Sequence, residues 1–211
     1  KINKKELNYK PFPFLLANTF ERKLFNYSIK DFQFEWKWDG IRIQLIKRCG
    51  NISVWTRGQE LVNDSFPELV KKISTIKDDF VIDGELLVWD FKEGIPKNFS
   101  FLQKRINRKS PSKSIQNKYP ITFISYDLLE LKGEDKRDQT LENRRIILEK
   151  KFLEWQNKTE KDICDILKIS DLIYPKNWEE TEKFKNKARY KGTEGLIIKN
   201  KNSIYSSGRK K

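Results

Sequence analysis

The sequence predicts one α+β domain in which mostly antiparallel β-sheets are flanked by helices. Apolar and polar residues alternate over 32–45 and again over 52–56, and a short turn at 49–51 separates two of these runs, as in a β-hairpin. Amphipathic helical patterns with polar capping residues follow between later apolar runs. The chain has 211 residues, no internal repeat and no change in composition, which fits a single domain with a substantial core.

The first two predicted strands surround a short charged turn. The apolar positions are Phe32, Phe34 and Trp36 before the turn and Ile41, Ile43 and Leu45 after it. Residues 37–42 between them read K-x-D-G-x-R. A lysine at such a turn stands on a rigid support but can still reach a ligand, and a lysine amine is a covalent nucleophile once it is deprotonated. The alternative is a plain Asp-Gly hairpin turn with a solvated lysine.

The strand predicted over 80–90 carries two acidic residues on one face. Strand alternation places Asp83 and Glu85 together, and it places the following residues on the opposite face: Ile82, Gly84, Leu86 and Val88. Buried carboxylates are costly unless they are paired, hydrogen-bonded or bound to a metal. We therefore expect these acids to line a cleft, with an edge strand whose second face is wet as the alternative.

Helices and strands alternate along the rest of the chain. The sequence predicts a helix over 65–76 opened by a Ser65-x-x-Glu68 capping box, a helix over 98–108, a polar loop over 110–118, a strand over 119–131, a helix capped by Thr140, a strand over 163–169, a helix from Asn177 to a glycine cap at Gly192, and a strand over 194–199. Arg144 and Arg145 fall in the apolar stripe of their helix, so at least one should turn inward and reach a carboxylate or a phosphate.

The composition excludes some kinds of site and favours others. There is no histidine, and Cys49 and Cys164 are far apart, which argues against zinc and rules out a histidine-based triad. A net charge of +14 favours a polyanionic partner. No apolar run approaches a membrane span, and an intracellular, reduced protein is expected. The chain begins at Lys1 and contains no methionine, so we expect a fragment of a longer protein, with residues 1–12 as a linker remnant.

Six stretches, in this order, resemble the nucleotidyltransferase (adenylation) domain of ATP-dependent DNA ligases. They are E-W-K-W-D-G-I-R at 35–42, T-R-G-Q-E at 56–60, V-I-D-G-E-L at 81–86, S-Y-D-L-L at 125–129, L-E-N-R-R at 141–145 and E-G-L-I-I-K at 194–199. The wording at 36–42 and the Y-x-x-G-R-K ending are most similar to bacterial ligases that accompany a main replicative ligase. The resemblance implies the fold shared by DNA ligases and mRNA-capping enzymes, with the adenylation domain over 13–211.

The resemblance also implies a role for each matching residue. Lys37 would be the nucleophile that takes AMP from ATP as a phosphoramidate. Around the nucleotide, Glu35 would contact adenine, Tyr126 would stack on it, Glu85 would bind the ribose hydroxyls and Lys199 the phosphates, while Arg42 and Arg57 would hold the ribose or the 5′-phosphate of the nick. Glu194, together with Glu85, would lie at the metal, and Arg209 would contact DNA. Asp39 and Arg144 match less specifically.

The implied ligands are ATP, Mg²⁺ (or Mn²⁺) and nicked double-stranded DNA. The expected protein is a monomer of the bacterial cytoplasm and nucleoid that seals nicks in repair, replication or recombination. Two departures from the family pattern stand out. The last lysine-rich motif and the OB-fold domain are expected beyond Lys211. Glu194 and Lys199 are five residues apart, so a straight strand would point them to opposite faces, and a bulge or a site at the strand end would reconcile them.

The proposed chemistry requires a deprotonated lysine. An ordinary lysine has a pKa near 10.4, and nearby cations favour its neutral form, so Arg42, Lys199 and Mg²⁺ are the expected neighbours of Lys37. RNA ligases and mRNA-capping-type nucleotidyltransferases share K-x-D-G and stay open as alternatives. A non-catalytic, basic nucleic-acid-binding module is a third; it accounts for the charge but not for the ordered motifs.

Overall fold

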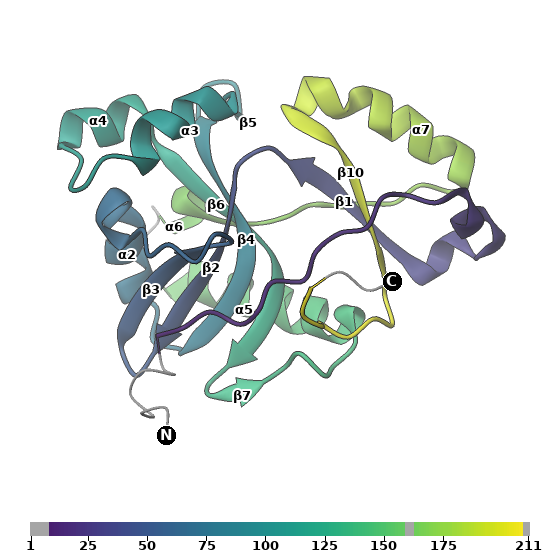
Figure 1. Ribbon diagram of the computed structural model, residues 1–211, viewed down its shortest axis with the longest axis horizontal. Coiled ribbons are helices and arrows are strands. Elements are labelled where there is room, and N and C mark those ends of the chain that lie inside the picture. Colours follow the sequence, from purple (N-terminus) through teal and green to yellow (C-terminus); the bar gives the residue numbers. More distant parts are fainter. Residues whose placement is uncertain (1–8, 159–162, 209–211) are drawn as a thin grey trace.

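The computed structural model describes residues 9–158 and 163–208, and its strands form two sheets (Figure 1). The larger sheet has the order β3–β2–β4–β6–β7, with β5 paired to β4 and β8 paired to β6. Its strands are β2 (Ile41–Arg48), β3 (Asn51–Thr56), β4 (Phe80–Asp90), β5 (Ile95–Pro96), β6 (Ile121–Leu131), β7 (Glu134–Asp135) and β8 (Leu167–Ile169). The smaller sheet has the order β10–β1–β9, formed by β10 (Thr193–Asn200), β1 (Phe32–Trp38) and β9 (Leu172–Ile173).

The strand pairings confirm the predicted fold class. Between the named strands, every pairing in the described part of the chain is antiparallel except that of β6 with β8. The helices are α2 (Pro67–Ser74), α3 (Phe99–Ile106), α4 (Lys113–Lys118), α5 (Leu141–Lys158), α6 (Ile163–Ile166) and α7 (Trp178–Lys187), with short 3₁₀ turns at Arg22–Asn26, Ile29–Asp31, Asn63–Ser65 and Ala188–Lys191. None of the described helices is long and apolar enough to cross a membrane.

Helices cover one face of the larger sheet and bury its main core. Leu69 and Ile73 of α2, Leu102 of α3 and Leu148 and Phe152 of α5 belong to the same buried cluster as the inward residues of β2, β3 and β4. In the helices these residues recur every three or four positions, and in the strands every second position, as each geometry requires. This cluster gives the larger sheet a firm support.

Chain near both termini crosses the other face of the larger sheet. Leu15 and Gly208 form a parallel β-bridge, and the Leu16 N–H donates to the Gly208 carbonyl at 2.8 Å. Phe12 exchanges backbone hydrogen bonds with the Gln44 side chain at 2.8 and 2.9 Å. Of the segment expected to be a linker remnant, residues 1–8 lie outside the described residues, and Phe12 lies bound to the sheet.

The smaller sheet buries an aromatic face against α7. Phe32, Phe34 and Trp36 alternate along β1 and form a cluster with Ile173 and Ala188. The Phe32 and Phe34 rings lie 5.5 and 5.9 Å from the Trp178 ring of α7. The alternation of β1 therefore leaves Gln33, Glu35 and Lys37 on the opposite face of this sheet.

Three local predictions were wrong. Ser65 does not cap a helix: α2 begins at Pro67, and the Ser65 hydroxyl donates to the Ile106 carbonyl at 2.8 Å. The loop predicted over 110–118 contains α4, because Ser112 caps it by accepting from the Ile115 N–H. The strand predicted over 163–169 begins as the short helix α6 and becomes β8 only at Leu167.

Other local predictions were confirmed. Thr140 accepts a hydrogen bond from the Asn143 N–H at 3.3 Å, and Asn177 accepts one from the Glu180 N–H at 2.9 Å. Gly192 ends its helical segment with φ of 64°, a left-handed conformation that suits glycine. Arg144 and Arg145 are both buried in the domain, as the stripe of α5 predicted.

Candidate active site

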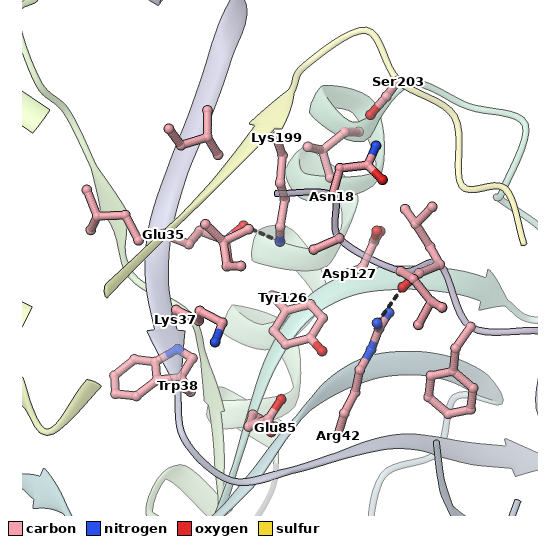
Figure 2. Close-up of a pocket in the computed structure, with 18 of the residues that line it drawn as sticks. Asn18, Glu35, Lys37, Trp38, Arg42, Glu85, Tyr126, Asp127, Lys199 and Ser203 are labelled. Atoms are coloured by element: carbon pink, nitrogen blue, oxygen red, sulfur yellow. Dashed lines mark hydrogen bonds and ion pairs between the residues drawn. The ribbon is translucent and has the colours of Figure 1, made fainter. Parts of the chain in front are cut away.

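A cavity of about 1700 Å³ lies between the two sheets. One wall is the open face of the smaller sheet, with Glu35 and Lys37 of β1 and Lys199 of β10. The other wall comes from the larger sheet, with Arg42 of β2, Glu85 of β4 and Tyr126 of β6; Arg57, which is exposed, also lines the cavity. Figure 2 shows the side chains of the two walls turned toward one another.

Lys37 forms an ion pair with Glu194 across the β1–β10 pair. The two side chains are about half exposed, at 49% and 43%. The pairing shifts register at this point, since Lys37 lies opposite Gly195 but Trp38 lies opposite Thr193, and Gly195 has φ of 152°. Glu194 therefore sits in a β-bulge, which brings it to the same cavity as Lys199 and resolves the spacing that a straight strand could not explain.

Glu35 and Lys199 form a second ion pair farther along the smaller sheet. The Lys199 ammonium donates to Glu35 Oε1 at 2.5 Å, and the Gln33 amide donates to the same oxygen at 2.7 Å. Lys199 Nζ also lies 4.6 Å from the centre of the Tyr126 ring. This group combines a flat aromatic face with a charged donor and a charged acceptor, which suits a planar, polar ligand such as a nucleobase.

Arg42 lines the cavity, but its guanidinium is already hydrogen-bonded to other groups of the protein. Its guanidinium donates to both oxygens of Asp83, at 3.0 and 2.7 Å, and also to the Leu15 carbonyl. Tyr205 donates its hydroxyl to Asp83 at 2.7 Å. The Arg42 group lies between the rings of Phe14 and Tyr126, 5.2 and 5.9 Å from their centres. Asp83 is thus paired, whereas only Glu85 of the two predicted carboxylates lines the cavity.

Glu85 has an unusual acidity for a carboxyl group. Burial raises its pKa to about 8; the Arg42 charge and a hydrogen bond from the Gly40 N–H oppose this rise, while Asp83 and Glu194 add to it. A β-carbon on Gly40 would meet the Leu86 carbonyl at 2.3 Å, so only glycine allows this approach. Burial, followed by Glu194, also raises the pKa of Asp39. The protonated forms of Glu85 and Asp39 are therefore favoured, and a bound cation would favour the ionised forms instead.

The neighbours of Lys37 differ from the expected ones. The cations expected beside it are paired elsewhere, Arg42 with Asp83 and Lys199 with Glu35, and the group in contact with Lys37 is a carboxylate. Sequence reasoning also missed Gln33, because a glutamine in an apolar strand carries no motif. Arg209 lies outside the described residues. Arg144 donates to both oxygens of Asp127, at 2.7 and 2.9 Å, and is a buried structural partner.

The family described as "ATP dependent DNA ligase domain" matches residues 13–211. The chain belongs to this family. Its membership confirms the resemblance on which the residue roles depend, and ATP is the nucleotide that the family uses. The roles of the individual residues stay predictions, because the family match identifies the domain but not the residues that contact the nucleotide or the DNA.

Relatives and solved structures agree with this ligase-domain assignment. A DNA ligase of Sulfophobococcus zilligii is 35% identical over 178 residues, covering 82% of this chain and 28% of that protein. A probable DNA ligase of Koribacter versatilis is 29% identical over 221 residues, covering 96% of this chain and 37% of that protein. The chain thus spans about a third of the length of these curated relatives.

The ligase domain of M. tuberculosis LigD has the same fold. It superposes with a TM-score of 0.70 at 24% identity, covering 93% of this chain and 57% of that one. The bacteriophage T7 ATP-dependent DNA ligase, solved in complex with ATP, gives a TM-score of 0.63 at 20% identity, covering 94% and 66%. These likenesses confirm the predicted nucleotidyltransferase fold.

The carboxylates of this ligase domain fit a magnesium ion that is shared with a nucleotide. Within the described residues no cluster of three or more His, Cys, Asp or Glu side chains could hold a metal by itself. Mg²⁺ is typically bound by one or two carboxylates together with substrate phosphates. Glu85 and Glu194 both line the cavity, and the pKa of Glu85, which is raised mainly by burial, is raised further by Glu194 because the two acids are close together.

Proposed function

We propose that this chain is the adenylation domain of a DNA ligase, in which Lys37 attacks the α-phosphate of ATP. A bond forms between Lys37 Nζ and the α-phosphorus as the bond to the departing pyrophosphate breaks, leaving lysyl-AMP. The AMP then passes to the 5′-phosphate of a DNA nick for sealing. The observation that carries the proposal is the position of Lys37, which faces Glu85 and Tyr126 across one cavity between the sheets.

The ion pair of Lys37 sets a condition on this reaction. An ammonium group held by a carboxylate has no lone pair with which to attack phosphorus. The contact with Glu194 must therefore open when nucleotide binds, and the amine must lose its proton. Mg²⁺ at Glu85 and Glu194 would supply Lewis-acid stabilisation of phosphate charge. Glu194 would then have a cation partner other than Lys37.

The remaining side chains divide between the two ends of the nucleotide. Tyr126 would stack on the adenine, with Glu35 at the edge of the base, and Glu85 would bind the ribose. Lys199 would serve the phosphates only after leaving Glu35, because its ammonium now lies beside the Tyr126 ring. Arg57 and Arg42 would meet the ribose or the nick phosphate; Arg42 must do so while paired with Asp83. Arg209 would contact the DNA.

The proposed substrate is nicked double-stranded DNA, bound by a monomer in the bacterial cytoplasm at the nucleoid. The net charge of +14 supports a polyanionic partner, and curated DNA ligases are among the relatives of the chain. DNA binding of this kind weakens steeply as salt increases, because the protein releases counterions from the phosphates.

A labelling experiment tests the proposal and separates it from its alternatives. The protein is incubated with Mg²⁺ and either ATP or GTP labelled at the α-phosphate, and covalent label is measured after denaturation. We expect label from ATP alone, which moves to the nicked strand when 5′-phosphorylated nicked DNA is added. Label from GTP would indicate a capping-type enzyme, and transfer only to RNA would indicate an RNA ligase. No covalent label from either nucleotide would leave the non-catalytic module and end the proposal.

A further inference from the structure

Two chain connections pass from one sheet to the other at the same place. β1 of the smaller sheet leads to β2 of the larger sheet through Asp39 and Gly40. β8 of the larger sheet leads to β9 of the smaller one through Ser170 and Asp171. These connections set how the two walls of the cavity lie, so a contact between them bears directly on the geometry of the site.

Ser170, in the second connection, is hydrogen-bonded to the end of β1, where the first connection begins. Its hydroxyl accepts a hydrogen bond from the Trp38 indole at 3.1 Å, and its N–H donates to the Ser125 carbonyl at 2.8 Å. Its own carbonyl accepts from Arg145 of α5 at 2.8 Å. The side chain is fully buried and is not among the described residues that line the cavity. Ser170 therefore bonds to three elements but has no direct access to a ligand.

The partners of Ser170 are the neighbours of the two key side chains. Trp38 directly follows Lys37, and Ser125 directly precedes Tyr126. The Trp38 ring is itself fixed, because it packs on a buried cluster of Leu87, Trp89 and Ile124, with its ring 6.2 Å from that of Trp89. A short chain of hydrogen bonds thus runs from the residue after the nucleophile to the residue before the aromatic platform.

We propose that Ser170 is a positioning residue that holds Lys37 at its working separation from Tyr126. The inference rests on the proposed function, since it assumes that Lys37 attacks a nucleotide seated on Tyr126. Attack requires the amine to lie in line with the departing group, and small misplacements of a reacting atom cost large factors in rate. Losing the Ser170 hydroxyl would remove the hydrogen bond that joins the end of β1 to the β8–β9 connection. The Trp38 ring would keep its packing on Trp89, and Tyr126 would stay on the larger sheet.

The test compares two variants that break the same hydrogen bond from opposite ends. Ser170→Ala removes the acceptor, and Trp38→Phe removes the donor but keeps an aromatic ring. For each, and for the double variant, three quantities are measured: the rate of lysyl-AMP formation at saturating ATP, the ATP concentration that gives half that rate, and the melting temperature. Ser65→Ala is the matched control, because it also removes a buried serine hydroxyl bond, to Ile106, outside the cavity.

We expect Ser170→Ala to slow the saturated rate on the order of tenfold, with a smaller change in half-saturating ATP. Trp38→Phe should slow it at least as much, because Trp38 also lines the cavity. The double variant should be little slower than Trp38→Phe, because both have already lost the shared bond. Ser170→Thr, which keeps the hydroxyl, should recover most of the rate. Ser65→Ala should lower the melting temperature but leave the saturated rate unchanged.

Three results would overturn the inference. They are an unchanged saturated rate in Ser170→Ala, an equal loss of rate in Ser65→Ala, and fully additive losses in the double variant. Wild-type protein that forms no lysyl-AMP would instead overturn the proposed function, so the two failures are distinguishable.

Discussion

The two sheets that enclose the cavity are supported very differently. The larger sheet packs against α2, α3, α5 and α6 through an extensive buried cluster, whereas the buried cluster of the smaller sheet comprises Phe32, Phe34, Trp36, Ile173 and Ala188. The larger sheet carries the groups that would stay in place, Tyr126, Glu85 and the paired Arg42. The smaller sheet carries the ion pairs of Lys37 and Lys199, which would open in the proposed reaction.

Under the proposed function, the larger sheet is therefore a supporting wall of the cavity and the smaller sheet is a reactive wall. Substitutions of Lys37 or Glu194 on the smaller sheet should alter chemistry and leave stability largely intact, because both side chains are about half exposed. Substitutions of buried charged groups on or beside the larger sheet should alter stability first. The experiments that follow test this division, beginning with the largest expected effect.

Replacing Lys37 should abolish the covalent nucleotide while the fold survives. Lys37→Ala removes the nucleophile, and Lys37→Arg should fail equally because a guanidinium stays protonated. The adduct is measured by the mass of the labelled peptide, and the melting temperature should change little, since the Lys37 side chain is 49% exposed. Lys71→Ala, an exposed lysine on α2, is the control and should label normally. A normal adduct yield on Lys37→Ala would show that another residue is the nucleophile.

Breaking the Arg144–Asp127 pair should cost stability instead. Burial raises the pKa of Asp127, and the hydrogen bonds from Arg144 oppose that rise. Arg144→Leu would strand the carboxylate, and removing one partner of a buried pair costs about 3–5 kcal/mol in the free energy of unfolding. Urea unfolding measures the loss. The Arg137–Asp135 pair is more exposed, at 31% and 45%, so Arg137→Leu should cost below about 1 kcal/mol. Equal losses of unfolding free energy in Arg144→Leu and Arg137→Leu would show that buried and exposed ion pairs do not differ here.

Glu85 lies on the larger sheet, and its raised pKa should make the stability of the protein depend on pH. Its pKa is about 8 in the folded protein and 4.5 ordinarily, so between these values the folded state binds more protons than the unfolded one. The stabilisation from its retained proton is complete below pH 4.5 and is lost as pH rises through 8. The free energy of unfolding, relative to that of Glu85→Gln, should therefore fall from pH 5 to pH 8, by at most about 1.4 kcal/mol per pH unit.

Unfolding curves for the two proteins at several pH values measure this difference. Glu179→Gln, which alters an exposed carboxyl on α7, should show no such trend relative to wild type. A constant difference between wild type and Glu85→Gln across this range would mean that water reaches the Glu85 carboxyl freely. Mg²⁺ with ATP should flatten the trend, since a bound cation favours the ionised carboxylate.

The sequence predicts the walls of the site better than the contacts between them. Alternation along 32–38 separated the aromatic face of β1 from Glu35 and Lys37, because each strand residue has only two directions to point. The strand at 80–90 and the caps at Thr140 and Asn177 also followed from local geometry. The bulge at Glu194 could only be left open, since a register shift depends on both paired strands.

Long-range hydrogen bonds decided the features that the sequence did not predict. The Ser65 hydroxyl is claimed by a carbonyl 41 residues away, which overrides its local capping signal. Ser170 and Tyr205 have partners 132 and 122 residues away, and no periodicity marks such residues. The pairing of Arg42 with buried Asp83 also had no signal in the sequence; it compensates a charge that would otherwise be buried alone.

The last and smallest expected effect concerns Tyr126, which should stack on the adenine. Tyr126→Ala should weaken ATP binding by about 1–3 kcal/mol, the range for stacking of a base on an aromatic side chain. Tyr126→Phe should keep most of the affinity, because it keeps the ring. Titration calorimetry measures the binding, and the melting temperature is recorded for each variant. Burial raises the pKa of the Tyr126 hydroxyl, so the phenol is neutral near pH 7 and ionisation does not affect the measurement.

Tyr119 provides the control for this prediction because it lies just before the same strand. It is partly buried, packs 6.1 Å from the Phe101 ring and is not among the described residues that line the cavity. Tyr119→Ala should therefore lower the melting temperature without changing ATP affinity. If Tyr126→Ala behaved the same way, Tyr126 would be a core residue of the supporting wall. The nucleotide would then have to be held by the smaller sheet alone. The proposal that the larger sheet binds the base while the smaller sheet carries the nucleophile would be wrong.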